Sequence, residues 1–412
     1  MIIKTQAYPR VGLIGNPSDG YFGKTIAFTF KDFCAEIELW ESPELELLPS
    51  RRDHSVFPSM CDLHEDVKRH GYYGGFRLLK ASCKCFLDYC NDRGIILDRR
   101  NFTMRYRSNI PGRVGLAGSS AIITACMRAL MGFYNVEITR HTLANLVLSV
   151  ENTELAIPAG LQDRVAQAYQ GLTYMDFDQK FMDERSYGNY KSLDIEKLPP
   201  CYIAYREDLA EGTEVYHNDL RARYKRKNPE VLQAIQRWAE LAEELKELLQ
   251  RSEVGDRKKE VGSRKTEVGS RRTEVACPKD APAARGGQEP IQNQLSPSST
   301  SALEHSSTSS LPPSSTSALS HSSTSELLPS STFALQEMHN LINENFNLRA
   351  SLYDVGDGNR EMVETARACG ASAKFAGSGG AIVGFLKDED TFAKLQAAFK
   401  PKGIVVLKPA IV

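Results

Sequence analysis

Glu151 and Asp163 are two acidic residues that stand twelve positions apart, with Pro158, Ala159 and Gly160 between them. The surrounding pattern predicts that Glu151 lies near the end of one helix and that Asp163 opens the next. In that arrangement one carboxylate can bind a divalent cation, and the other can accept the proton of a reacting hydroxyl group. A solvated glutamate and a helix-capping aspartate are the alternative, which these residues alone leave open.

A stretch rich in glycine and serine, residues 111–121, precedes a long apolar segment that is predicted to form a buried helix over residues 119–133. Glycine lets the backbone approach phosphate groups closely. The first turn of a helix offers free N–H groups and the positive end of the helix dipole, so this stretch can bind an anion. A serine hydroxyl there can also reach Mg²⁺. Helix capping by serine is the alternative interpretation.

Two further loops are rich in small and polar residues. Residues 10–25 lie between predicted strands, where a loop can present hydrogen-bonding groups to a ligand, and residues 370–381 precede another strand. The first loop ends in Gly-Lys-Thr at residues 23–25, as a Walker A loop does. We reject that motif, because Ser18 stands where it needs glycine and because residues 25–30 are predicted to form a strand instead of a helix. Ordinary turns are the alternative for both loops.

Strands and helices alternate along the chain and must position these groups. In the first part, strands are expected at residues 26–30, 35–40, 171–177 and 201–205, and helices at 75–91, 119–133, 139–155, 162–170 and 229–250. In the last part, helices are expected at 335–351, 360–369 and 390–399, and strands at 381–385 and 403–407. The order indicates two domains of mixed α and β structure.

Residues 251–334 depart from this pattern. A Glu-Val unit recurs every seven residues from Glu253 to Glu274, and threonine recurs every eight residues from Thr300 to Thr332. One valine in seven residues is too little for a coiled coil. Such a composition cannot bury enough apolar surface to offset the entropy of ordering the chain. We therefore predict a disordered tandem-repeat insertion here, with a function such as serine phosphorylation as the alternative.

The 412-residue chain carries 51 Lys and Arg against 52 Asp and Glu, a formal net charge of -1. This balance gives no general attraction to nucleic acid or to an anionic membrane, so neither is expected as a partner, and no protein partner is evident. Neither a signal peptide nor a membrane span is expected. The nine cysteines are odd in number and are expected to be reduced, which indicates the cytoplasm.

Taken in order, the candidate features resemble those of the GHMP kinase superfamily of small-molecule kinases. Residues 10–25 are similar to its sugar-binding signature, residues 115–121 to its phosphate loop, residues 160–163 to the segment that carries its catalytic aspartate, and residues 377–380 to its C-terminal glycine-rich motif. The resemblance covers the chain except for the insertion.

The resemblance implies the two-domain α+β fold of GHMP kinases. The expected parts are an N-terminal domain of ribosomal-protein-S5-like β/α type at residues 1–180, a C-terminal ferredoxin-like α+β domain at 181–250 plus 335–412, and the disordered low-complexity insertion at 251–334. The sugar and ATP sites would lie in the N-terminal domain.

The resemblance also implies roles for individual residues. Asp163 would be the base that accepts the proton of the sugar hydroxyl, and Arg10 would stabilise charge near the transferred phosphoryl group. Ser120 (or Ser119) and Glu151 would hold Mg²⁺. The implied substrate-binding residues are Asn16, Asp19, Tyr21 and Arg164, and the implied ATP-binding residues are Gly115, Leu116, Ala117, Gly118, Ser119, Ser120, Gly377, Ser378 and Gly379.

Within the superfamily, the glucuronokinases are the most similar, on residues 10–19, 71–75, 160–167 and 373–380. This resemblance implies ATP-dependent phosphorylation of the anomeric hydroxyl of D-glucuronate to D-glucuronate 1-phosphate. Arg164, Lys24 and Lys374 are the candidate cations for the carboxylate of such a substrate.

Two alternatives remain. One is a GHMP kinase for another acceptor, such as galacturonate, galactose or an isoprenoid alcohol. Galactokinases carry Glu-His where this chain has Asn16-Pro17, which disfavours galactose. The other is a non-catalytic sugar- or ATP-binding protein of the same fold, which the retention of Asp163, Glu151 and Ser120 disfavours.

Overall fold

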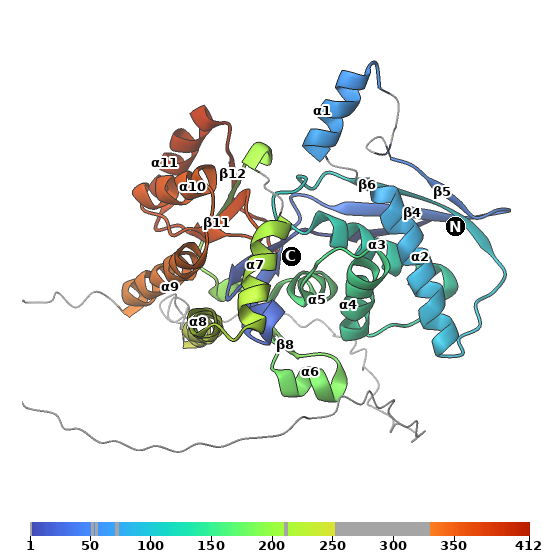
Figure 1. Cartoon of the computed structure of the whole chain (residues 1–412), viewed down its shortest axis with the longest axis horizontal. Coiled ribbons are helices and arrows are strands. Elements are labelled where there is room, and N and C mark those ends of the chain that lie inside the picture. The colour runs from blue at the N-terminus through green and yellow to red at the C-terminus, as the bar shows by residue number, and fades with distance from the viewer. Residues whose placement is uncertain (1, 51–52, 54–56, 71–73, 210–212, 252–329) are drawn as a thin grey trace, which may run out of the picture. The chain divides into compact units, whose positions relative to one another are not determined.

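The computed structural model describes residues 2–50, 53, 57–70, 74–209, 213–251 and 330–412, which belong to one compact unit (Figure 1). The predicted insertion lies outside the described residues except at its two ends. Residue 251 ends one helix, and the next helix already begins at Ser330, five residues before its predicted start. The domain boundary near residue 180 stays a prediction.

A mixed four-stranded sheet forms the first layer of the N-terminal half. Its strands are β1 (Ile2–Ala7), β4 (Ala35–Ser42), β6 (Asn101–Ser108) and β5 (Glu46–Leu48), in that order across the sheet. Only β5 runs parallel to its neighbour. Apolar side chains alternate along β4 and β6, so one face of the sheet is buried, and α3 packs on β1 and β4.

A second sheet carries the first site residue. It consists of β2 (Arg10–Ile14), β3 (Lys24–Thr29), β7 (Leu172–Asp176) and β8 (Asn189–Leu193), all antiparallel. Every residue of β2 is buried, because the strand pairs with β3 and is in addition contacted by the helices α5 and α9. Strand β3 occupies the place where a Walker loop would begin a helix, so the rejection of that motif is confirmed.

A third antiparallel sheet belongs to the C-terminal half. It consists of β10 (Lys374–Phe375), β11 (Ala381–Phe385), β9 (Cys201–Tyr205) and β12 (Val405–Leu407). Helices α10 and α11 lie beside β11 and β12 (Figure 1). A separate small core of apolar side chains, which includes Tyr202, Phe346 and Phe399, forms there.

The helices of the described residues are α1 (Met60–His70), α2 (Gly75–Asp92), α3 (Gly118–Tyr134), α4 (Arg140–Ser149), α5 (Leu161–Tyr169), α6 (Gln179–Arg185), α7 (Thr213–Lys225), α8 (Pro229–Arg251), α9 (Ser330–Leu352), α10 (Asp357–Ala368) and α11 (Glu389–Phe399). Two short turns matter for the site: the 3-10 helix η1 (Ser18–Tyr21) and the π-helical turn η3 (Val150–Glu154) that follows α4. None of the described helices is both long and apolar enough to cross a membrane.

Most of the predicted elements are confirmed. Strands β9 and β11 have the predicted bounds, and α3 and α5 match within one residue at each end. The predicted helix at 139–155 is interrupted, because its last turn is η3. Six helices and strands of the described residues were not predicted, namely α1, β6, α6, β8, α7 and β10.

Helix α8 offers a test of the packing. Its Trp238 is fully buried and donates a hydrogen bond from Nε1 to Asn345 O of α9 at 3.2 Å. We expect Trp238→Ala to lower the free energy of unfolding by about 3–5 kcal/mol, because it leaves a large cavity. Leu232→Ala, on the same helix but at a side chain that is 39% exposed, should cost much less. Urea unfolding of both variants measures the difference, and equal losses would contradict the packing described.

Candidate active site

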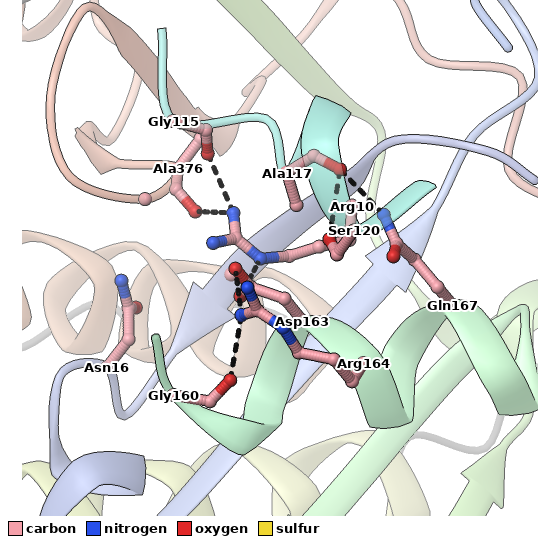
Figure 2. A network of polar contacts seen from close by, with 12 residues as sticks. Arg10, Asn16, Gly115, Ala117, Ser120, Gly160, Asp163, Arg164, Gln167 and Ala376 are labelled. Carbon is pink, nitrogen blue, oxygen red and sulfur yellow. Dashed lines mark hydrogen bonds and ion pairs between the residues drawn. The ribbon is translucent and has the colours of Figure 1, made fainter. Parts of the chain in front are cut away.

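Arg10 and Asp163 form an ion pair at the centre of the candidate site (Figure 2). Arg10 Nε lies 2.5 Å from Asp163 Oδ1, and the side chains are 7% and 18% exposed. Burial acts to raise the pKa of Asp163, but Arg10 and Arg164 beside it hold that pKa below its usual value. Asp163 is therefore an ionised carboxylate at neutral pH.

Arg10 also joins the two glycine-rich loops. Its Nη1 donates to Gly115 O at 2.7 Å and to Ala376 O at 3.0 Å (Figure 2). The backbone of β2 adds two bonds, from Arg10 N to Leu116 O at 3.2 Å and from Gly12 N to Ala376 O at 2.8 Å. The loop before α3 and the loop between β10 and β11, far apart in the sequence, are thus both fastened to the start of β2.

The two loops touch at glycines. A Cβ atom at Gly377 would fall 2.2 Å from Gly115 O, so no side chain fits there. Gly115 has φ +71, and a Cβ on it would lie 2.8 Å from Ser378 N. Arg349 of α9 donates to Gly377 O at 2.8 Å and to Ser378 O at 3.2 Å. Of the predicted ATP-binding residues, Gly115, Gly377 and Ser378 therefore meet at one place, with Gly379 next to them.

Arg164, the residue after Asp163, forms ion pairs and hydrogen bonds with neighbouring residues of the site. Its Nε lies 2.6 Å from Glu151 Oε2, and its Nη1 donates to Asp163 Oδ2 at 2.9 Å and to Gly160 O at 2.8 Å. The side chain is 5% exposed. Burial acts to lower its pKa, but the carboxylates of Glu151 and Asp163 raise that pKa overall. The predicted contact between Arg164 and a substrate stays a prediction.

The predicted metal ligands lie at the start of α3 and in η3. Ser119 Oγ donates to Glu151 Oε1 at 2.8 Å, whereas Ser120 Oγ donates to Ala117 O at 3.1 Å. A hydroxyl and a carboxylate oxygen side by side are donors that suit Mg²⁺, which commonly binds one or two carboxylates plus substrate phosphates. Within the described residues, no group of three or more His, Cys, Asp or Glu side chains could hold a metal ion.

The predicted acceptor loop follows β2. Asn16 is 4% exposed and Tyr21 is 8% exposed, and the Tyr21 ring lies 4.8 Å from that of Tyr224 in α7. The Asp19 carboxyl approaches Gly160, where a Cβ would lie 2.6 Å from Asp19 Oδ2. Burial, with Asp163 nearby, raises the pKa of Asp19 to about 6. Residues 71–73, part of another segment of the predicted resemblance, lie outside the described residues.

Two buried side chains, Asn345 and Lys374, hold this loop, and Asn345 was not predicted as a site residue. Asn345 of α9 accepts from Gly15 N at 2.7 Å and donates to Asn16 O at 3.1 Å. Lys374 donates to Asn16 Oδ1 at 2.6 Å, to Gly12 O at 2.6 Å and to Phe375 O at 2.7 Å. Burial, together with Arg349 and Arg10, lowers the pKa of Lys374 well below its usual value. The sequence analysis considered Lys374 only as a candidate cation for the substrate. Residue spacing could not show that its side chain reaches Gly12 of β2 and Asn16.

Comparison with known proteins identifies the family. The model of the N-terminal domain of GHMP kinases matches residues 77–171, and the model of the C-terminal domain matches residues 332–404. The chain is 35% identical to glucuronokinase 1 of Arabidopsis thaliana over 399 residues, which is 95% of this chain and 87% of the relative. The chain belongs to the GHMP kinase family. GHMP kinases use ATP as co-substrate, so this GHMP kinase is a phosphotransferase that acts on an alcohol group.

Solved structures agree with the GHMP kinase fold that the sequence predicted. Lactococcus lactis galactokinase complexed with galactose superposes with a TM-score of 0.64 at 13% identity and covers 100% of this chain and 93% of that chain. Methanococcus jannaschii mevalonate kinase superposes with a TM-score of 0.59 at 18% identity and covers 100% and 98%. At these identities the likeness shows the fold alone.

The raised pKa of Asp19 predicts a pH effect on stability. Between its usual value of 3.8 and about 6, the folded protein holds a proton that the unfolded chain has released, so this group's contribution to stability falls as pH rises through that window. Asp19→Asn removes the effect. The stability of the variant minus that of the wild-type protein should therefore be larger at pH 7.5 than at pH 4. The midpoints of urea unfolding at the two pH values measure this difference. The exposed Asp178→Asn is the control, and a difference for Asp19→Asn that does not change with pH would contradict the raised pKa.

Proposed function

We propose that this GHMP kinase transfers the γ-phosphoryl group of ATP to the anomeric hydroxyl of D-glucuronate, giving D-glucuronate 1-phosphate and ADP. The observation that carries the proposal is the Arg10–Asp163 pair, which sits where the two glycine-rich loops meet. The 35% identity to a glucuronokinase over 95% of the chain supports the acceptor.

In the proposed mechanism, Asp163 orients the acceptor hydroxyl and takes its proton as the new O–P bond forms. A carboxylate is a weak base, but phosphoryl transfer depends mainly on positioning and on charge neutralisation, and the hydroxyl loses its proton late. Asp163 is suited to this role because Arg10 and Arg164 keep it ionised. Arg10 lies beside the base and so would also stabilise negative charge on the transferred group.

The backbone around the start of α3 would hold the β- and γ-phosphates. Residues 115–120 combine a left-handed glycine, a helix N-terminus and two serines, and anions bind at such sites through N–H groups. Mg²⁺, when bound, would neutralise phosphate charge. Ser119 and Glu151 are our candidates to hold it, because their oxygens are 2.8 Å apart, whereas Ser120 is turned to Ala117 O. Asn16, Asp19 and Tyr21 would contact the sugar.

The substrate can be tested with a panel of acceptors. Purified protein with Mg-ATP should release ADP on addition of D-glucuronate, and less with galacturonate, galactose, glucose or mevalonate. A coupled assay of ADP release measures all five. Release with another acceptor but none with glucuronate would overturn the substrate while keeping the kinase, and no release with any acceptor would contradict the proposed sugar kinase.

The proposed base can be tested with Asp163→Asn. We expect turnover to fall about 100-fold or more, the usual size of a general-base contribution. Nucleotide binding should persist, because an asparagine oxygen can still accept from Arg10 Nε. ADP release and calorimetric titration with nucleotide measure the two effects.

The control is Asp183→Asn, at an exposed aspartate of α6, which should keep full turnover. An Asp163→Asn variant with near-normal turnover would exclude Asp163 as the base. A joint loss of turnover and nucleotide binding would indicate a structural role instead.

A further inference from the structure

Two buried side-chain amides meet at Gly12 of β2. A Cβ atom at Gly12 would lie 3.1 Å from Gln162 Nε2 and 3.2 Å from Asn16 Cγ, so both amides lie against the bare backbone of this glycine. Gln162 is 3% exposed and Asn16 is 4% exposed. Gln162 directly precedes Asp163, the proposed base, in the sequence. An amide can present either its oxygen or its nitrogen, and the chemistry of the site depends on which one is presented.

The orientation of the Asn16 amide follows from Lys374. Lys374 Nζ lies 2.6 Å from Asn16 Oδ1, and its other two partners, Gly12 O and Phe375 O, are backbone carbonyls that can only accept. In the structure Lys374 Nζ donates to all three of these oxygens. Asn16 Oδ1 therefore accepts the hydrogen bond from Lys374. Asn16 Nδ2 is the other end of the amide, and it donates no hydrogen bond to any residue of the described ranges.

The orientation of the Gln162 amide follows from Asp163. The Gln162 side chain faces the Asp163 carboxylate and helps to lower its pKa, and an ionised carboxylate can only accept, so the Gln162 nitrogen is the end of the amide that faces it. Gln162 Oε1 then remains as an acceptor. It is buried and has no hydrogen-bond partner among the described residues. A buried acceptor without a partner is unfavourable, and such atoms in native proteins usually have a partner that is a ligand or water.

We propose that Asn16 and Gln162 together bind one hydroxyl group of the acceptor sugar, the hydroxyl next to the one that is phosphorylated. A hydroxyl both accepts and donates, so it matches one free donor and one free acceptor, whereas a carboxylate or a ring oxygen can only accept. This inference rests on the proposed function. For phosphorylation at C1 of D-glucuronate, the neighbours of the reacting hydroxyl are the ring oxygen and the 2-hydroxyl, and only the 2-hydroxyl can donate to Gln162.

The amide pair would also orient the reacting hydroxyl. Gln162 would bind the 2-hydroxyl through Oε1 while its nitrogen faces Asp163, so a single side chain would link the proposed base to the neighbouring sugar carbon. Lys374 is then a positioning residue, which acts on the sugar only through Asn16. A sugar without the 2-hydroxyl would leave the buried acceptor Gln162 Oε1, and the donor Asn16 Nδ2 beside it, without this partner, and such sites discriminate strongly.

The experiment compares kcat/KM for D-glucuronate and 2-deoxy-D-glucuronate. The wild-type protein should prefer glucuronate by about 10- to 100-fold, as expected for the loss of hydrogen bonds to buried polar groups. Gln162→Met, which keeps the side-chain length but has no amide, should lose most of this preference. Asn16→Asp keeps an oxygen for Lys374 and lacks the N–H donor, so it should also lower the preference and remains informative if Gln162→Met does not fold.

Gln167→Met is the matched control. Gln167 is a buried glutamine of the same helix whose Oε1 also lacks a partner, but its Nε2 donates to Ala117 O at 2.9 Å instead of to Asp163. Its preference for glucuronate should equal that of the wild type. Thermal unfolding and nucleotide binding report whether each variant is folded.

The outcomes separate the inference from the proposed function. Equal kcat/KM of the wild type for the two sugars, or an unchanged preference in folded Gln162→Met and Asn16→Asp, would overturn the amide pair and leave the kinase proposal intact. If galacturonate is the substrate, the same comparison with 2-deoxygalacturonate applies. No turnover of any sugar by the wild type would overturn the proposed function and this inference with it.

Discussion

A buried ion pair, Arg10 with Asp163, is the interaction on which the rest of the site depends. Removing one member of a buried pair costs about 3–5 kcal/mol, because the remaining charge has no compensation. Arg10 also binds the carbonyl oxygens of Gly115 and Ala376, so the group that keeps Asp163 ionised also fixes the positions of both glycine-rich loops. The placement of Asp163, the proposed base, relative to the loop before α3 therefore follows from the contacts of one guanidinium group.

Strand β2 makes this coordination feasible because it contacts both halves of the fold. Its residue Gly12 bonds to Ala376 through N–H and to Lys374 through C=O, and it carries no side chain that would displace Asn16 or Gln162. Helix α9 supports the same region from the other side, through Asn345 on the acceptor loop and Arg349 on the C-terminal glycine-rich loop. Directional hydrogen bonds from fixed helices thus hold loops that have little apolar side chain to bury.

The sequence was sufficient for the elements with a strong period and for the residues in compact motifs. Strands β9 and β11 and the buried helix α3 were predicted from apolar runs alone. Strand β6 was missed although Phe102, Met104 and Tyr106 alternate along it, so the signal was present and unused. Helix α6 is short and buries no residue, which leaves little periodicity to detect.

The site residues likewise fall into those that the sequence predicted and those that it could not predict. Local motifs located Arg10 and Asp163, but no pattern in the sequence could show that Lys374 faces Asn16 or that the Ser119 hydroxyl, and not that of Ser120, is turned to Glu151. These facts depend on the rotation of a helix and on the pairing of strands distant in the chain. The role inferred for Gln162 likewise depends on its contacts in the fold. Its side chain lies against Gly12 and faces the Asp163 carboxylate, which the sequence could not show.

The charge balance of the site limits how the proposed anionic acceptor could bind. With a formal net charge of -1, the whole chain supplies no general attraction, so attraction must be local. Locally, Arg10 and Arg164 are offset by Asp163 and Glu151, and the pKa of Asp19 is already raised to about 6 by burial and by Asp163. A second carboxylate placed next to Asp19 would raise that pKa further and would weaken its own binding. We therefore expect the acceptor to place its carboxylate away from Asp19 and to direct its hydroxyl groups toward Asp163, an orientation in which uncharged amides such as Asn16 and Gln162 are suited to contact the sugar ring.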